Sequence, residues 1–304
     1  MRRQVLVGIA VGLVTVLGGG LLIWAGSQGL LSPQGPARRL LTAAQRAAQR
    51  GDLPTAQAKL DELIASQPSA PETADALFQL GQVQEQQQKL LEARAAYRQL
   101  LDKFPDSPVI AQAQARLGAV NVALFFSRQV TEADGTYDVM PGDSLGKIST
   151  SYNTTVEYLK QANALPSDMI RPNQRLKVPK GRFTIVVDKS QNQLLLTQDN
   201  QFFKIYPVAT GKDNSTPVGT FRIVNKLAKP VWYAQGAVVP PESPENVLGS
   251  RWLGLDKPGY GIHGSVDPSG IGHQVTAGCV CMHNSDVEEL FTILPVGTPV
   301  TIVD

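Results

Sequence analysis

The chain has 304 residues, of which 42% are hydrophobic and 18% are charged, so it can bury a core in about two domains and wholesale disorder is excluded. Its formal net charge is only +2, from 28 Lys and Arg against 26 Asp and Glu. Without a concentrated basic face we expect no nucleic-acid partner. Two cysteines are too few for a disulfide-scaffolded mini-domain or a Cys₄ zinc module.

Residues 1–31 are predicted to be a membrane anchor or a signal segment. After Arg2 and Arg3, residues 5–25 carry no charge, and a helix of that length spans the roughly 30 Å hydrocarbon core of a bilayer. A cleaved signal peptide is the alternative, although its apolar region is usually shorter, about 7–15 residues. We expect a single-pass protein of the inner or cytoplasmic membrane, with its N-terminal end in the cytoplasm and the bulk of the chain in the periplasm or cell wall.

Residues 37–130 are rich in Ala, Gln and Leu, with apolar residues at helical spacing. They repeat at an interval of 37 residues, so that Leu40 recurs as Leu77 and Pro68 as Pro105. The pattern resembles tetratricopeptide repeats, all-α units that must stack to cover their apolar faces. We expect two full repeats and a closing helix near residues 111–126. The resemblance implies a site for an unknown protein partner, or a spacer without a ligand.

Residues 135–181 contain TYDVMPGDSLGKISTSYNTTVEYLKQANAL and end in DMIRPNQRLKVPKG. They resemble a LysM domain, a small βααβ module, in which Ser144 would cap the first helix. Asn173 stands where the family often has Gly, and Asn tolerates the left-handed backbone of a turn. The resemblance implies binding of N-acetylglucosamine-containing glycans, and the alternative is a fold kept for packing. The candidate glycan contacts are Gly142, Asp143, Ser144, Leu145, Met169 and Ile170.

Residues 182–304 consist of short runs rich in β-branched and aromatic residues, such as FTIVV and QLLLT, separated by turn residues. This pattern predicts a β-dominated domain. Only the stretch from Ser285 to Ile293 has a helical pattern, with Ser285 as its expected N-cap. The predicted fold is therefore multidomain: a transmembrane helix, all-α repeats, a βααβ module and a β-dominated C-terminal domain.

All three histidines and both cysteines lie in the 21-residue window from His263 to His283. A cysteine is nucleophilic as its thiolate, so it needs a base or a positive dipole that lowers its pKa from about 8.5. Cys279 follows two small residues, whose exposed amide N–H groups could hold an oxyanion. His263, in a Gly-rich turn, is the candidate base. These residues predict thiol chemistry in the C-terminal domain.

The segments YGIHGSVDPSG and TAGCVCMHNSDVEEL resemble the catalytic core of YkuD-type L,D-transpeptidases, which carry a His-Gly and then Ser/Thr-x-Gly-Cys-x-Arg. The resemblance implies an acyltransferase without cofactor or metal that acts on peptidoglycan stem peptides, in cell-wall organisation and cell shape. Cys279 would form the thioester, and His263 would accept the thiol proton and later activate the acceptor amine. The amides of Gly278 and Cys279 would form the oxyanion hole, the carbonyl near Gly264 would hold the imidazole tautomer, and Thr276 would order the turn.

Cys281 stands where the family has Arg, whose forked donors a cysteine cannot replace in binding a carboxylate. Arg251 or His283 could take over that role. Activity could instead be weakened, with a catalytically silent peptidoglycan-binding protein as the extreme case. A third alternative makes Cys281 a redox partner of Cys279, although a disulfide between residues i and i+2 of a strand is strained. Trp252 is a further candidate for the substrate groove.

A zinc site is an alternative of another class. Cys279, Cys281 and His283 alternate, so on a strand they would face one way, and His263 could complete a tetrahedron. Structural zinc cysteines, however, usually pair as C-x₂-C. We therefore expect a thiol nucleophile and no metal.

Overall fold

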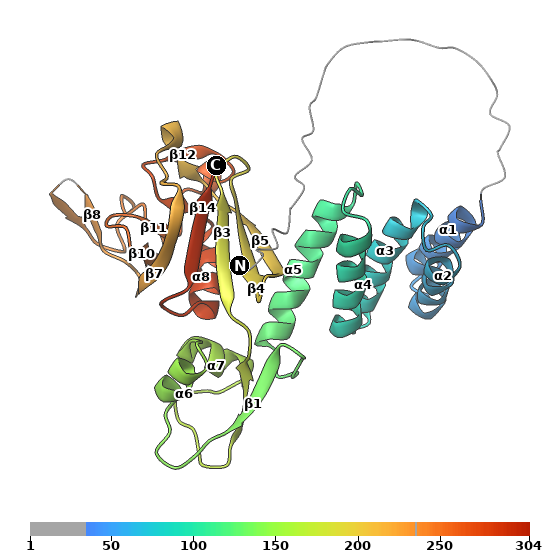
Figure 1. Ribbon diagram of the computed structural model, residues 1–304, viewed down its shortest axis with the longest axis horizontal. Helices are drawn as coiled ribbons and strands as arrows, with labels where there is room; N and C mark the ends of the chain where they lie inside the picture. The colour runs from blue at the N-terminus through green and yellow to red at the C-terminus, as the bar shows by residue number, and fades with distance from the viewer. Residues whose placement is uncertain (1–34, 235) are drawn as a thin grey trace, which may run out of the picture. The chain divides into compact units, whose positions relative to one another are not determined.

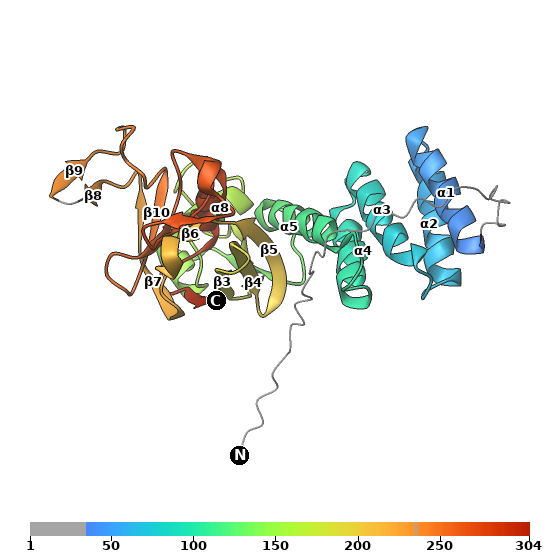
Figure 2. The same cartoon turned by 90° about the horizontal axis from the view of Figure 1, so that it is seen from above.

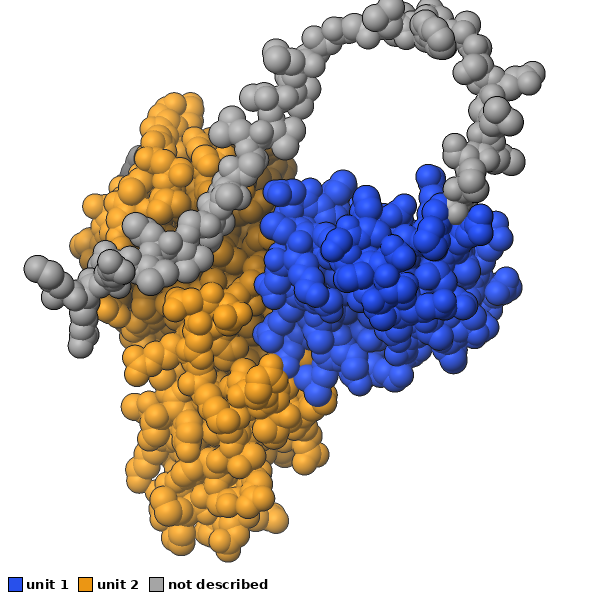
Figure 3. Space-filling view, turned by 45° about the vertical axis from the view of Figure 1, so that its right-hand side comes forward, with its two compact units in different colours: residues 1–113 blue, residues 114–304 orange. Residues whose placement is uncertain are grey.

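The computed structural model describes residues 35–234 and 236–304 (Figure 1). The predicted membrane anchor at residues 1–31 lies outside these residues. Within the part of the chain that the structure describes, no helix combines the length and the apolar character needed to cross a bilayer. The chain divides into two compact units, residues 1–113 and residues 114–304, which Figure 3 colours separately.

The first unit is built from antiparallel helix pairs (Figures 1 and 2). Position 81 on α3 has room only for glycine, because a Cβ there would overlap the ring of Tyr97 on α4. Tyr97 is fully buried, and its hydroxyl donates to Glu85. A small residue at position 81 thus lets the paired helices α3 and α4 approach closely. The helices are α1 (Pro36–Gln49), α2 (Leu53–Ser66), α3 (Glu72–Gln86) and α4 (Leu90–Lys103).

Helix α5 (Ile110–Phe126) belongs to the second unit from residue 114 onward. The amide of Asn121 donates to the Phe203 carbonyl over 2.8 Å. The buried amine of Lys177, 3.2 Å from Asp134, caps the end of the helix. It donates to the carbonyls of Leu124, Phe125, Ser127 and Gln129. We expected the repeat region to run to residue 130, but these contacts make the closing helix part of the second unit.

The next elements form a βααβ module. Strands β1 (Asp134–Asp138) and β2 (Arg175–Pro179) pair antiparallel around α6 (Leu145–Ser151) and α7 (Val156–Ala162). Ser144 caps α6 by accepting from the Lys147 N–H, and Thr155 caps α7 in the same way. Asn173 adopts φ of +67°, so the turn keeps its left-handed geometry without glycine.

The C-terminal domain is built on an eight-stranded sheet in the order β13-β11-β10-β7-β14-β3-β4-β5. Neighbouring strands run antiparallel except for the parallel pairs β3–β14 and β11–β13. In β3 the burial alternates residue by residue, which is typical of a strand with one face on the core. The eight strands are β3 (Phe183–Asp188), β4 (Gln193–Gln198), β5 (Gln201–Pro207), β7 (Gly219–Ala228), β10 (Arg251–Leu255), β11 (Gly261–His263), β13 (Val280–Cys281) and β14 (Pro299–Val303).

Shorter elements complete this domain. The strands β6 (Thr210–Gly211) and β12 (Gln274–Thr276) pair in parallel, whereas β8 (Trp232–Ala234) and β9 (Ala237–Val239) form a hairpin that projects from the sheet (Figures 1 and 2). Two 3₁₀ turns, η1 (Lys212–Asn214) and η2 (Pro268–Gly270), lie in the connecting loops.

Helix α8 (Asn284–Ile293) packs against β10 and β11. The expected N-cap at Ser285 is wrong: the cap is His283, whose carbonyl accepts from the N–H groups of Asp286 and Val287. The helix therefore starts with Asn284, which brings that side chain to the sheet.

Candidate active site

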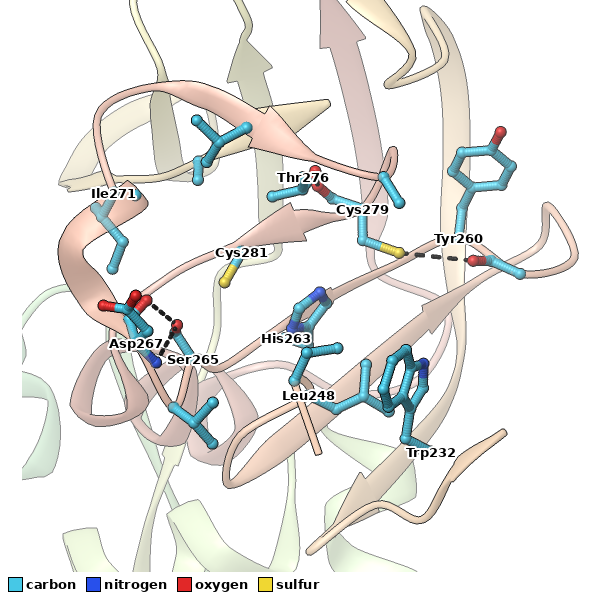
Figure 4. Close-up of a pocket in the computed structure, with 17 residues that line it drawn as sticks. Trp232, Leu248, Tyr260, His263, Ser265, Asp267, Ile271, Thr276, Cys279 and Cys281 are labelled. Carbon is cyan, nitrogen blue, oxygen red and sulfur yellow. Dashed lines mark hydrogen bonds between the residues drawn. The ribbon is translucent and has the colours of Figure 1, made fainter. Parts of the chain in front are cut away.

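The cysteine and the histidine meet at one edge of the sheet. Strands β11 and β13 run parallel with His263 opposite Cys281, and Cys279 directly precedes β13. All three side chains line a cavity of about 680 Å³. Figure 4 shows the Cys279 thiol and the His263 ring side by side on one wall of this cavity. Register between two short strands therefore places His263 opposite Cys281, two residues after Cys279, on the wall of the same cavity.

The imidazole of His263 is held in one tautomer. Its Nδ1 lies 2.7 Å from the carbonyl oxygen of Gly264, which can only accept, so Nδ1 carries the hydrogen and Nε2 keeps its lone pair. Trp252 stacks on the His263 ring, with the two ring centroids 5.8 Å apart and the ring planes at 19° to each other. Burial lowers the pKa of His263 to about 4, more than the Gly264 hydrogen bond raises it. At neutral pH the ring is therefore an uncharged base.

The Cys279 thiol is also uncharged in the resting site. It is half-buried, and its Sγ donates to the Gly259 carbonyl over 3.5 Å. Burial raises the pKa of the Cys279 thiol, and a hydrogen bond from the Gly261 backbone only partly lowers it. From the sequence we expected a base that would lower the pKa of Cys279. Because burial disfavours both charged forms, the resting pair is a thiol beside a neutral imidazole.

The turn before the cysteine is held by Thr276. Its hydroxyl donates to the Cys279 carbonyl over 2.7 Å and accepts from the Gly278 N–H over 3.2 Å. Gly278 adopts φ of +135°, and a Cβ there would lie 3.0 Å from the Tyr260 ring. The Gly278 N–H therefore points into the turn in this structure, rather than into the cavity as the expected oxyanion hole requires.

Cys281 is a second free thiol on the cavity wall. It is buried, and its Sγ donates to the Gly264 carbonyl over 3.2 Å. The same carbonyl accepts from His263. Cys281 thus occupies the expected arginine position as a small, uncharged residue that supports the turn holding the base.

Neither of the two expected substitutes for that arginine reaches the cavity. Arg251 donates to the Ser250 carbonyl over 2.8 Å and lies 3.7 Å from a Glu288 oxygen, on the side of α8. His283 caps α8. Both are absent from the cavity lining among the described residues. The alternative in which one of them takes over from the arginine therefore gains no support from their positions, since Arg251 pairs with Glu288 and His283 stands at the start of α8.

The aromatic residues of the cavity differ from the one predicted. Trp252 does not line the cavity but stacks behind His263. Trp232, from the β8–β9 hairpin, and Tyr260 line it instead (Figure 4). Tyr260 stands three residues before His263 in the motif that identified the site, so its position was a usable signal. Trp232 carried no such signal, because the hairpin is distant from the motif in the chain.

Asn284 is a site residue that the sequence reasoning missed. Its Oδ1 accepts from the Ser250 N–H and its Nδ2 donates to the Ser265 carbonyl, each over 2.9 Å. A Cβ on Gly264 would overlap Oδ1 of Asn284. The amide therefore fixes the turn whose carbonyl orients His263. Its place next to the helix start was a signal, but we assigned that segment to helix capping.

The zinc alternative has too few ligands. In the described part of the chain, no three His, Cys, Asp or Glu side chains are grouped so that they could hold a metal ion. His283 lies outside the cavity that Cys279, Cys281 and His263 line. Cys279, Cys281 and His283 therefore do not face one way as a set of metal ligands, since the strand ends at Cys281.

The candidate glycan contacts of the βααβ module separate into two groups. Leu145 is 2% exposed and belongs to the core, and the Asp143 carboxylate accepts from the Tyr137 hydroxyl and the Met140 N–H. These two side chains are therefore occupied by the fold itself. Gly142, Ser144 and Met169 are exposed and Ile170 is half-buried. Met169 lines a shallow hollow of about 500 Å³ in the loop before β2.

A neutral cysteine–histidine pair on the wall of an open cavity is the arrangement of a thiol-dependent acyl-transfer site. Three family models match the chain in order: a tetratricopeptide repeat over residues 41–108, a LysM domain over residues 137–179 and the L,D-transpeptidase catalytic domain over residues 182–302. The predicted order of repeats, LysM domain and L,D-transpeptidase catalytic domain is thereby confirmed.

Curated relatives show the same family. The putative L,D-transpeptidase YkuD of Bacillus licheniformis is 37% identical over 174 residues, covering 55% of this chain and 97% of that protein. The putative L,D-transpeptidase YqjB of Bacillus subtilis is 41% identical over 126 residues, covering 40% of this chain and 70% of that protein. The chain therefore belongs to the L,D-transpeptidases, a family of acyltransferases.

Solved structures of L,D-transpeptidases also match the chain, at low scores. One from Mycobacterium smegmatis is 19% identical with a TM-score of 0.35, covering 43% of this chain and 64% of that one. The catalytic domain from Enterococcus faecium is 26% identical with a TM-score of 0.34, covering 40% of this chain and 96% of that one. The family assignment rests on the sequence relatives.

Proposed function

We propose that this protein transfers acyl groups of peptidoglycan stem peptides through a thioester on Cys279. The observation that carries the proposal is that the Cys279 thiol and a His263 ring of fixed tautomer line one open cavity. A thiol that can pass its proton to a neutral imidazole is an activated nucleophile.

The first half-reaction forms the acyl-enzyme. As the Cys279 sulfur attacks the stem-peptide carbonyl, its proton moves to Nε2 of His263, and the C–S bond forms. The imidazolium then protonates the leaving amine as the C–N bond breaks, which releases the terminal D-amino acid. Because both groups are neutral at rest, the charges develop only during attack. General base catalysis of this kind contributes about 10²–10⁴-fold in rate.

The second half-reaction returns the enzyme to rest. An acceptor amine attacks the thioester, His263 removes the amine proton, and a new C–N bond replaces the C–S bond. The proton then returns to the sulfur. Thr276 holds the carbonyl of the nucleophile's own residue through this cycle, and rotation of the Gly278 peptide would supply a second oxyanion donor beside the Cys279 amide.

The remaining modules deliver the substrate in this proposal. A glycan-binding module over residues 135–181 tethers the catalytic domain, residues 182–304, to peptidoglycan strands, and tethering raises the effective concentration of stem peptides. The helical repeats at residues 37–130 bind a protein partner or act as a spacer, and residues 5–25 anchor the chain in the membrane. The protein then works on the extracytoplasmic side of the membrane.

Acylation of purified protein by a disaccharide-tetrapeptide tests the proposal. Mass spectrometry should find the acyl adduct on a peptide containing Cys279, with loss of one D-amino acid. Cys279→Ala should form no adduct, whereas Cys281→Ser should still form it. A folded protein whose Cys279 is alkylated by iodoacetamide but never acylated would contradict the proposal.

A catalytically silent peptidoglycan-binding protein is the second candidate. It is favoured by one observation: of the described residues that line the cavity, none is Lys or Arg. That candidate predicts glycan binding without acylation, so the same experiment separates the two.

A further inference from the structure

The cavity has two chemically different ends. Figure 4 shows Tyr260 and Trp232 on one side of the Cys279–His263 pair, and Ser265, Asp267 and Ile271 beyond Cys281 on the other. We call the second side, defined by Cys281, Ser265, Asp267 and Ile271, the acidic end. The name follows from its charge, because Asp267 is the one acidic residue in the described lining and no Lys or Arg accompanies it.

The two side-chain hydrogen-bond donors of the acidic end, Cys281 and Ser265, are already engaged. The Cys281 thiol donates to the Gly264 carbonyl over 3.2 Å. The Ser265 hydroxyl donates to the Asp267 carbonyl. The Asp267 carboxylate is exposed and accepts from the Ser269 N–H at Oδ1. The side chains of this end therefore present to a ligand one carboxylate and no donor that is not already engaged.

These donors and acceptors decide which ligand groups the acidic end can bind. A carboxylate is acceptor-only and needs donors, whereas an ammonium has three donors and no acceptor. The charge acts in the same direction, since the Ser269 N–H lowers the pKa of Asp267 and keeps the carboxylate ionised. An arginine at position 281 would have reversed both properties, and Arg251 is held elsewhere by Ser250 and Glu288.

We propose that the acidic end receives the side chain of the acyl residue and selects one that ends in an amine or an amide, against one that carries a free carboxylate. The inference rests on the proposed function, because it names the donor for the same site. The acyl residue is joined to Cys279 through its carbonyl, so its side chain starts beside the sulfur. Cys281 is two residues further along the chain, at the end of β13, about 6.6 Å away for extended backbone at 3.3 Å per residue, which is within reach of a lysine-length side chain.

Three tetrapeptide donors that differ in the side chain of the third residue test this proposal. One carries lysine, one carries diaminopimelate with a free side-chain carboxylate, and one carries the same residue with that carboxylate amidated. Acylation rates of the wild-type protein and dissociation constants for the Cys279→Ala variant are measured for each. A single charge contact at an exposed site is expected to give a preference on the order of tenfold for the lysine and amidated donors over the free carboxylate.

Two variants assign the preference to the acidic end. Cys281→Arg should reverse it in favour of the free carboxylate. Asp267→Asn should reduce the advantage of lysine over the amidated donor, and 0.5 M salt should do the same by screening. Asp256→Asn removes one exposed acidic charge outside the cavity and is the matched control, which should leave all three rates unchanged.

The outcomes separate this inference from the proposed function. Equal rates and equal dissociation constants for the three donors, or a wild-type preference for the free carboxylate, overturn the inference while acylation itself upholds the function. Discrimination in binding to Cys279→Ala without any acylation of the wild type overturns the function and supports the selectivity of the cavity. Failure of every donor both to bind and to acylate overturns both.

Discussion

Replacing Asn284 by alanine tests how the histidine is held. The substitution removes two hydrogen bonds, to the Ser250 N–H and the Ser265 carbonyl. At about 0.5–1.5 kcal/mol for each bond, we expect the free energy of unfolding to fall by about 1–3 kcal/mol. For a unit of this size that corresponds to a loss of about 2–4 °C in Tm per kcal/mol.

The same change should slow acylation beyond its effect on stability. Asn284 holds the turn whose Gly264 carbonyl orients His263, and misplacing a catalytic group by about 1 Å can cost 10²-fold in rate. We expect a reduction of about 10–100-fold, measured by mass spectrometry of the acyl-enzyme. Since burial holds the pKa of His263 near 4, a loosened turn should also move the acid limb of the pH–rate profile upward.

Two variants control this experiment. Asn284→Asp keeps an acceptor for Ser250 and loses the donor to Ser265, so its acylation rate should be intermediate. Asn163→Ala removes a comparable set of bonds in the βααβ module, where the Asn163 amide bonds the backbone of Lys177 and Leu159. It should lower the Tm but leave acylation of a glycan-free peptide unchanged. If Asn284→Ala acylates at the wild-type rate while its Tm falls, the positioning argument is refuted.

Two further predictions concern the same site. Unfolded histidine binds a proton near pH 6.5, but folded His263 does so only near pH 4, so the free energy of unfolding should fall by on the order of 3 kcal/mol as the pH drops from about 6.5 to 4. Urea unfolding at several pH values should show this fall in the wild type and not in His263→Gln. If the free energy of unfolding changed equally with pH in the two proteins, the prediction would be contradicted. Thr276→Val should reduce acylation by about tenfold or more, since both bonds of its hydroxyl are lost, whereas Thr276→Ser should retain most of the rate. Equal rates for these two variants would show that the hydroxyl is dispensable.

Much of the fold could be predicted because its signals are local. The caps at Ser144 and Thr155 each bond a backbone N–H three residues on, so the sequence contains both partners. The 37-residue repeat placed the helix pairs in the same way. The boundary of the repeats had no local signal, because the contacts that hold the end of α5 come from Lys177 and Phe203, far along the chain.

The candidate site was predictable only in part. The motif pointed to His263 and Cys279, and both line the cavity. It did not indicate that burial leaves the pair uncharged, since desolvation depends on everything packed around the two side chains. The misplaced helix start at Ser285 had a further effect: it hid Asn284, which acts on a turn formed 20 residues earlier.

The amino-acid sequence alone determined the order of the modules, the two chemical groups of the site and the loss of an arginine at position 281. Whether another cation replaced that arginine was decided only by the tertiary structure. Arg251 is next to Trp252 and the site on strand β10, yet its guanidinium lies near Glu288 and over the ring of Phe291, both on α8. The direction of a side chain depends on strand register and on partners distant in the chain, and the local sequence determines neither.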